Sequence, residues 1–185
     1  MSQRNTVIRS MHDLGLAAWF GGGLMGAVGL NGAAAKAKDP AERLSLASVG
    51  WSQWSPVQFA AMALHGIGGI GLIYANKSRL LAQPGSRANT TVKVIVTLGA
   101  IGSTIYSGLV GTKMAKHSSE GGAGVTEAHP GASPELQSAQ DQQRILQWVT
   151  PVLTAVLIIL AAQQGEQQRP IAGLLKARLD KVRRG

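Results

Sequence analysis

Four long apolar runs alternate with polar segments along the chain, and this pattern predicts the fold. The runs contain no Asp, Glu, Lys or Arg, have lengths of 22, 20, 19 and 18 residues, and cover Leu14–Ala35, Pro56–Ala75, Val94–Thr112 and Ile145–Ala162. A helix needs about 20 apolar residues to cross a hydrocarbon core of about 30 Å. The sequence therefore predicts an all-α integral membrane protein, with a four-helix transmembrane domain over residues 1–165 and a tail over 166–185.

The charged residues indicate how the four helices are oriented. The 185 residues include 18 Lys and Arg and nine Asp and Glu, which gives a formal net charge of +9. With four spans both termini share one side of the membrane, and twelve of the cations fall on that side, against six on the other. The positive-inside rule then predicts cytoplasmic termini in a bacterial inner membrane, with residues 36–55 and 113–144 on the far side.

Composition also limits the chemistry that the chain can carry. The sequence has no cysteine, which excludes disulfides, thiolate metal sites and cysteine-ligated iron–sulfur clusters. The four spans contain no carboxylate, lysine or arginine, and no nucleophile–base pair lies within them, so we predict no catalytic residue and no dedicated metal site. The lack of intramembrane carboxylates also weakens the case for ion-coupled transport.

Small residues at regular spacing predict how the spans pack. Because helices in lipid associate through close backbone approach, small side chains four positions apart indicate contact faces. The first three spans carry such faces, and the predicted packing residues are Gly22, Gly26, Gly99, Ser103, Ser107 and Gly111. The fourth span is bulky and aliphatic. We therefore expect spans one to three to form a tight bundle and span four to pack more loosely.

The connections and the tail differ in character. The connection over residues 113–144 is rich in Gly and Ser, so most of it is expected to be mobile, with a helical end over Glu135–Arg144 that Ser133 caps. Trp51 and Trp54 precede the second span and are typical of interfacial anchors. The tail has helical apolar spacing and is expected to bind anionic lipid headgroups, not nucleic acid, through Lys176, Arg178, Lys181, Arg183 and Arg184.

His65 is the first candidate functional residue. It lies ten residues into the second apolar run, near the middle of the membrane, where a polar side chain must find a partner inside the bundle. Three roles stay open: a hydrogen bond to a hydroxyl group of the third span, a haem or metal ligand, or part of a proton or substrate path. The suitable hydroxyl partners are Ser103, Thr104 and Ser107.

The first apolar run and the residues before it carry a further motif, in which His12 is followed by Trp19 seven residues later and then by Gly21 and Gly22. These residues resemble the first helix of small bacterial four-helix membrane proteins, a group that includes copper-resistance D-type proteins and haem-binding membrane protoporphyrinogen oxidases. The resemblance covers about 12 residues, from Met11 to Gly22. It implies a four-helix core and a role for His12 as a haem or copper ligand.

One haem shared by the two histidines is not expected from the sequence. At a rise of about 1.5 Å per residue, His65 lies roughly 15 Å from the inner end of its span, whereas His12 lies at the inner mouth of the first span. Two axial ligands must face one iron at nearly the same depth. A haem bound by both histidines is therefore not expected unless the first span is shifted outward.

Three functions fit these observations. The leading prediction is a non-catalytic accessory or assembly subunit that joins other membrane subunits, because the spans carry packing faces and no internal chemistry. The alternative is a membrane redox protein that binds haem b or a metal through His12 or His65. The second alternative is a small transporter or channel, which predicts a polar cavity beside His65.

Overall fold

The computed structural model describes residues 5–82 and 84–167, and in this part of the chain it contains helices and no strands. The helical elements are α1 (Thr6–Met25), a π-helical turn (Gly26–Leu30), α2 (Asn31–Ala34), α3 (Pro40–Ala75), α4 (Lys77–Ala82), α5 (Pro84–Lys116), a 3-10 turn (Ser118–Glu120) and α6 (Pro134–Gln167). Four helical segments of the described chain are long and apolar enough to cross a membrane. The predictions of an all-α protein and of four long apolar helices are confirmed.

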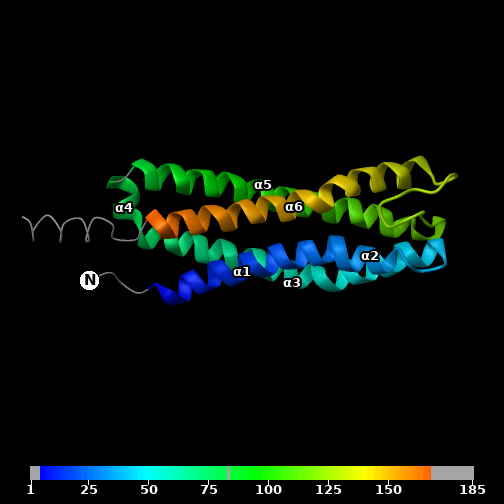
Figure 1. The fold of residues 1–185 in the computed structure, drawn as a ribbon, viewed down its shortest axis with the longest axis horizontal. Helices are drawn as coiled ribbons and strands as arrows, with labels where there is room; N and C mark the ends of the chain where they lie inside the picture. The colour runs from blue at the N-terminus through cyan, green and yellow to red at the C-terminus, as the bar shows by residue number, and fades with distance from the viewer. Residues whose placement is uncertain (1–4, 83, 168–185) are drawn as a thin grey trace, which may run out of the picture.

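The four long helices lie side by side along one axis, as two closely packed pairs (Figure 1). One pair is α1 with α3, and the other is α5 with α6. Helix α1 also packs along α6, whereas α3 and α5 share few contacts. The expectation that span four packs loosely is wrong, because α6 is closely paired with α5. The loosest seam of the bundle lies between α3 and α5.

Two glycines set the close approach of α1 to α3. A Cβ atom added at Gly15 would lie 2.5 Å from the carbonyl oxygen of Ala61 and 2.5 Å from the backbone nitrogen of His65. A Cβ atom added at Gly68 would lie 2.5 Å from the backbone nitrogen of His12. These distances are far below van der Waals contact, so only glycine lets the two backbones touch here.

Further along the same helix pair, glycines make room for tryptophan rings. A Cβ atom added at Gly22 would overlap the ring of Trp54, and one added at Gly26 would overlap the ring of Trp51. Trp51 packs against the buried core at this end of the bundle. The two tryptophans, expected as interfacial anchors, therefore pack between helices in the structure. Their rings lie against the predicted packing residues Gly22 and Gly26.

Hydroxyl and amide side chains join α5 to α6. The hydroxyl groups of Ser103 and Thr150 lie 2.7 Å apart, within hydrogen-bond distance. The side-chain amide of Gln143 donates to the hydroxyl of Ser107 at 2.8 Å. Such interhelical hydrogen bonds stabilise packing in an apolar medium. They explain why α6 packs closely on α5 although its sequence is rich in bulky aliphatic residues.

The two glycines predicted to pack on α5 behave differently. A Cβ atom added at Gly99 would lie 3.8 Å from the side chain of Leu153 on α6, which is ordinary van der Waals contact. At Gly111 the added atom would meet no described atom within 4 Å. Gly99 thus lies at the α5–α6 contact, and Gly111 faces open space.

The π-helical turn in the first span brings a polar side chain into the bundle. A π turn widens the helix by one residue and changes which face the following residues occupy. The next residue, Asn31, is 7% exposed. Its amide nitrogen donates to Gln147 on α6 at 3.0 Å, and its amide oxygen accepts from the indole nitrogen of Trp51 at 2.9 Å. Asn31 therefore ties three helices together at this end.

Residues 117–133 form a packed cap over this end of the bundle, so the expectation that most of this connection is mobile is wrong. Val125 is only 4% exposed and belongs to the core. The guanidinium of Arg43 donates to the backbone carbonyl oxygen of Ala123 at 2.8 Å. The side-chain amide of Gln140 donates to the backbone carbonyl oxygen of Val125 at 3.0 Å. Side chains from α3 and α6 thus satisfy backbone groups of the cap, as buried polar groups require.

Glu120 links the cap to the start of α6. Its carboxylate accepts from the backbone nitrogen of Ser133 at 2.8 Å and from the imidazole of His117 at 2.6 Å. These hydrogen bonds hold the pKa of Glu120 below its usual value. The hydroxyl of Ser133 in turn accepts from the backbone nitrogen of Leu136 at 3.2 Å. The predicted helix start over Glu135–Arg144 and its cap at Ser133 are confirmed.

The predicted basic tail lies outside the described residues. The structure therefore says nothing of its helical pattern or of its five cations, Lys176, Arg178, Lys181, Arg183 and Arg184. Lipid binding by the tail stays a prediction.

Candidate functional site

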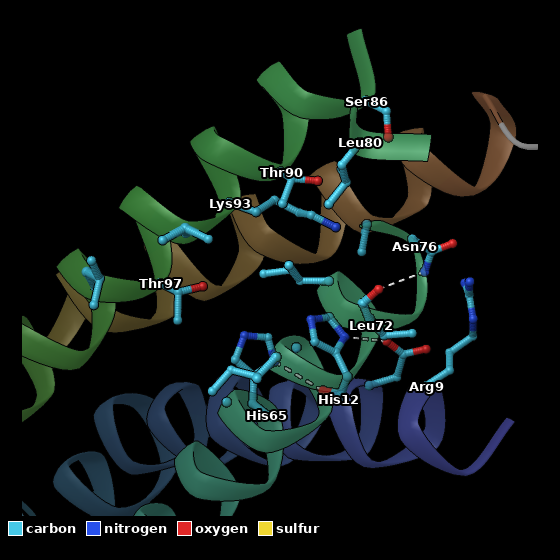
Figure 2. A pocket seen from close by; sticks show the side chains of 18 of the residues that line it. Arg9, His12, His65, Leu72, Asn76, Leu80, Ser86, Thr90, Lys93 and Thr97 are labelled. Carbon is cyan, nitrogen blue, oxygen red and sulfur yellow. Dashed lines mark hydrogen bonds and ion pairs between the residues drawn. The ribbon is translucent and has the colours of Figure 1, made fainter. Parts of the chain in front are cut away.

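His12 of α1 and His65 of α3 meet inside the bundle (Figure 2). Their ring centroids are 4.2 Å apart and the ring planes are tilted by 38°. The two residues are 9% and 4% exposed. The expectation that they lie at different depths is wrong, because α1 begins at Thr6, eight residues before the apolar run that begins at Leu14. The close contact at Gly68 then places the backbone of His12 beside α3.

Both imidazoles are held by hydrogen bonds from the same ring position. Nδ1 of His65 donates to the backbone carbonyl oxygen of His12 at 3.1 Å, and Nδ1 of His12 donates to a carboxylate oxygen of Asp13 at 2.8 Å. In a neutral imidazole the other nitrogen then carries no proton and is an acceptor or a metal ligand. In the neutral form of each ring, these hydrogen bonds leave Nε2 with a lone pair. His65 does not take its expected hydroxyl partner on the third span.

Trp19 is fully buried beyond the histidine pair. Its ring contacts His65 edge-on, with centroids 6.1 Å apart, and its indole nitrogen donates to the hydroxyl of Thr104 on α5 at 3.1 Å. The seven-residue spacing of His12 and Trp19 thus places both on the α1 face that contacts His65. The hydroxyl of Thr104, expected as a partner of His65, instead bonds Trp19.

A cavity of about 300 Å³ lies beside the histidine pair, between α1, α3 and α5 (Figure 2). Its size is at the lower end of the roughly 300–1,000 Å³ range of small-molecule sites. Much of its wall is apolar, from Ile70, Ile73, Val94, Leu98 and Ile101. Charged and polar side chains also line it, among them Arg9, Asp13, Asn76, Ser86, Thr90 and Lys93. The cavity can therefore hold a largely apolar molecule that has an anionic end.

The donor set at this site does not match a site for a bare metal ion. Among the described residues, no group of three or more His, Cys, Asp or Glu side chains could hold a metal. Zinc and copper sites use three or four protein ligands. A haem brings four nitrogen ligands of its own and needs only one or two axial side chains from the protein. Two imidazoles beside an apolar cavity fit that requirement.

The site includes residues that the sequence analysis did not single out. Asp13 orients His12, Lys93 lines the cavity from α5, and Arg9 lines it from α1. No family model, curated protein or solved structure matches the chain. The resemblance of the first helix to copper-resistance D-type and haem-binding proteins therefore stays a prediction. A signal for the wider site was present, since Arg9 and Lys93 both lie at the edges of apolar runs, on the same predicted side of the membrane.

Proposed function

We propose that this chain is a membrane protein that binds haem b in the cavity between α1, α3 and α5. The observation that carries the proposal is the histidine pair, whose Nδ1 atoms are both bonded to oxygen acceptors at the wall of a largely apolar cavity. Bound haem supplies one-electron redox chemistry, and the protein determines its ligand, orientation and surroundings.

His12 is the proposed axial ligand. Metal-ligating histidines commonly donate their second ring nitrogen to a carboxylate or carbonyl, which fixes the ring and makes the ligand more basic. The bond from Nδ1 of His12 to Asp13 at 2.8 Å has this form. His12 is also the residue that the resemblance of the first helix implies as the ligand.

His65 is proposed to position His12. Two imidazoles on opposite faces of one iron have centroids roughly 6 Å apart, because each metal–nitrogen bond is about 2 Å long. The observed separation of 4.2 Å is too short for that arrangement. His65 instead packs against the ring of His12 and bonds its backbone carbonyl, and both contacts hold the proposed ligand in place.

The charges around the cavity support an anionic end of the ligand at the inner side. Arg9 and Lys93 line the cavity together with one carboxylate, that of Asp13, so the charged lining has an excess of positive charge that attracts the carboxylates of a porphyrin. We place these residues at the cytoplasmic side of a bacterial inner membrane, because the predicted cytoplasmic segments hold twelve of the 18 cations. The apolar side chains farther along α3 and α5 would contact the macrocycle.

Mild-detergent purification of the tagged protein from its native membrane tests the proposal. The wild-type protein is expected to show a Soret band and bound iron porphyrin, and His12→Ala is expected to lose both. His65→Phe keeps an aromatic ring beside His12 and is expected to keep the band with weaker binding. A colourless wild-type sample that copurifies with stoichiometric partners would instead indicate the accessory subunit that the spans alone predict.

A further inference from the structure

The cavity beside the histidine pair lies at the loosest seam of the bundle. Helices α1 and α3 are closely paired, as are α5 and α6, whereas α3 and α5 share few contacts. Most of the residues that line the cavity come from α3 and α5. The cavity therefore lies between α3 and α5, the neighbouring helices whose contact is weakest.

Four apolar side chains line the cavity and are also exposed at the surface of the bundle. Ile70 and Ile73 of α3 are 71% and 39% exposed, and Leu98 and Val94 of α5 are 63% and 41% exposed. A side chain that both lines a cavity and faces outward marks its mouth. We call these four residues the lateral mouth. In a membrane they face the hydrocarbon core, where apolar side chains are favoured.

The inner end of the cavity has a more polar lining than the lateral mouth. The short helix α4 connects α3 to α5 there, and its residue Leu80 lines the cavity (Figure 2). Asn76 and Ser86, on either side of α4, also line it. Arg9 and Asp13 of α1 line the cavity and are exposed, so a molecule that entered from water at this end would pass charged side chains.

We infer that the ligand enters the cavity sideways from the bilayer, through the lateral mouth between α3 and α5. The inference rests on the proposed function for the identity of the ligand, haem b. A porphyrin dissolves in the bilayer with its apolar face in hydrocarbon and its carboxylates at the interface. The same orientation fits the cavity, with apolar residues at the mouth and Arg9 and Lys93 among its lining.

A spin-label experiment tests the mouth without any haem. Gly66 lines the cavity, and a Cβ atom added there would meet no described atom within 4 Å. Because the chain has no cysteine, Gly66→Cys provides a single labelling site, with Gly102→Cys on the outer surface of α5 as the matched control. In vesicles, the Gly66 label is expected to be relaxed by lipid-soluble oxygen and shielded from a water-soluble nickel chelate. Stronger relaxation by the nickel chelate would overturn lateral entry.

Blocking the mouth tests the route of the ligand itself. Leu98→Cys carries a bulky maleimide at the mouth, and Leu109→Cys, 59% exposed on the same helix, carries it away from the cavity. Haemin dissolved in phosphatidylcholine vesicles is mixed with vesicles that contain each protein, and the Soret change is followed in time. The label at Leu98 is expected to slow loading about tenfold, and the label at Leu109 to leave the rate unchanged.

The outcomes separate the two proposals. A label at Ser86→Cys, at the inner end, that slows loading while the label at Leu98 does not would overturn lateral entry and leave haem binding intact. A Soret change that is absent in every sample, including the unlabelled protein, would contradict the proposed function. In that case the spin-label result alone decides whether the lateral mouth opens to the bilayer.

Discussion

Replacement of Gly68 by alanine tests whether the contact of α1 with α3 builds the histidine site. The added Cβ would lie 2.5 Å from the backbone nitrogen of His12 and 2.8 Å from its Cα atom. Normal contact begins near 3.4 Å, so the two backbones must separate by roughly 1 Å, and overpacking of this kind costs about 1–3 kcal/mol. For a chain of this size, each kcal/mol lowers Tm by about 2–4 °C.

Gly66→Ala is the matched control for Gly68→Ala. It lies two residues away on the same helix, and its added Cβ would meet no described atom within 4 Å. Alanine favours a helix over glycine by up to about 1 kcal/mol, so this control is expected to be neutral or stabilised. The assay is thermal unfolding in detergent, in which Gly66→Ala is the control for stability only, because Gly66 lines the cavity. Equal stability of the two variants would refute the close-contact reasoning.

Three further predictions concern separate parts of the molecule. Asn31→Leu removes the hydrogen bonds to α6 and Trp51 and is expected to cost about 1–2 kcal/mol in unfolding by SDS titration, whereas an unchanged stability would contradict the role of the π turn. Asp13→Asn removes the carboxylate partner of His12 and is expected to weaken haem binding about 10–100-fold in a Soret titration. Glu120 has a lowered pKa, so its contribution to the cap is fully present above the ordinary Glu pKa of about 4.3 and is lost as pH falls through the lower folded-state value. After correction for the intrinsic exchange rate, which itself falls on acidification, the protection of residues 117–133 against hydrogen exchange is therefore expected to decrease on acidification in the wild type and to change less in Glu120→Gln.

The sequence predicts the architecture because its signals are local and strong. Apolar runs of near-membrane length identify all four long helices. The start of α6 is also predicted, since the hydroxyl of Ser133 and the following Pro134 form a local capping signal. The seven-residue spacing of His12 and Trp19 correctly places them on one helix face. These features depend on neighbouring residues only, and no tertiary contact is needed to recognise them.

The depth of the histidine site could not be predicted from the apolar runs. Because Arg9 and Asp13 are charged, the first apolar run starts only at Leu14, whereas helix α1 begins at Thr6. Both charged residues line the cavity and belong to α1, so their charges do not mark the end of the helix. A limit based on charge alone therefore places His12 too close to the surface, and it separates two rings that are in contact.

Long-range contacts explain the other differences. The cap over residues 117–133 has the composition of a mobile segment, but Arg43 and Gln140 bond its backbone from helices far away in the sequence. The π turn at Gly26–Leu30 has no clear sequence signal, although it decides which way Asn31 points. Composition and periodicity describe each segment alone, and they do not show which side chains of other segments satisfy its backbone.

The measurement that tests the central claim most directly is a haem b titration of the purified protein, followed by its Soret band, for wild type and His12→Ala. The histidine pair at the cavity predicts saturable binding at one haem per chain in the wild type and loss of that binding in His12→Ala. Gly102→Ala, which changes a glycine with open space around it on the outer surface of α5, is expected to bind like the wild type. Equal binding by the wild type and His12→Ala, or no saturable binding by either, would contradict the account.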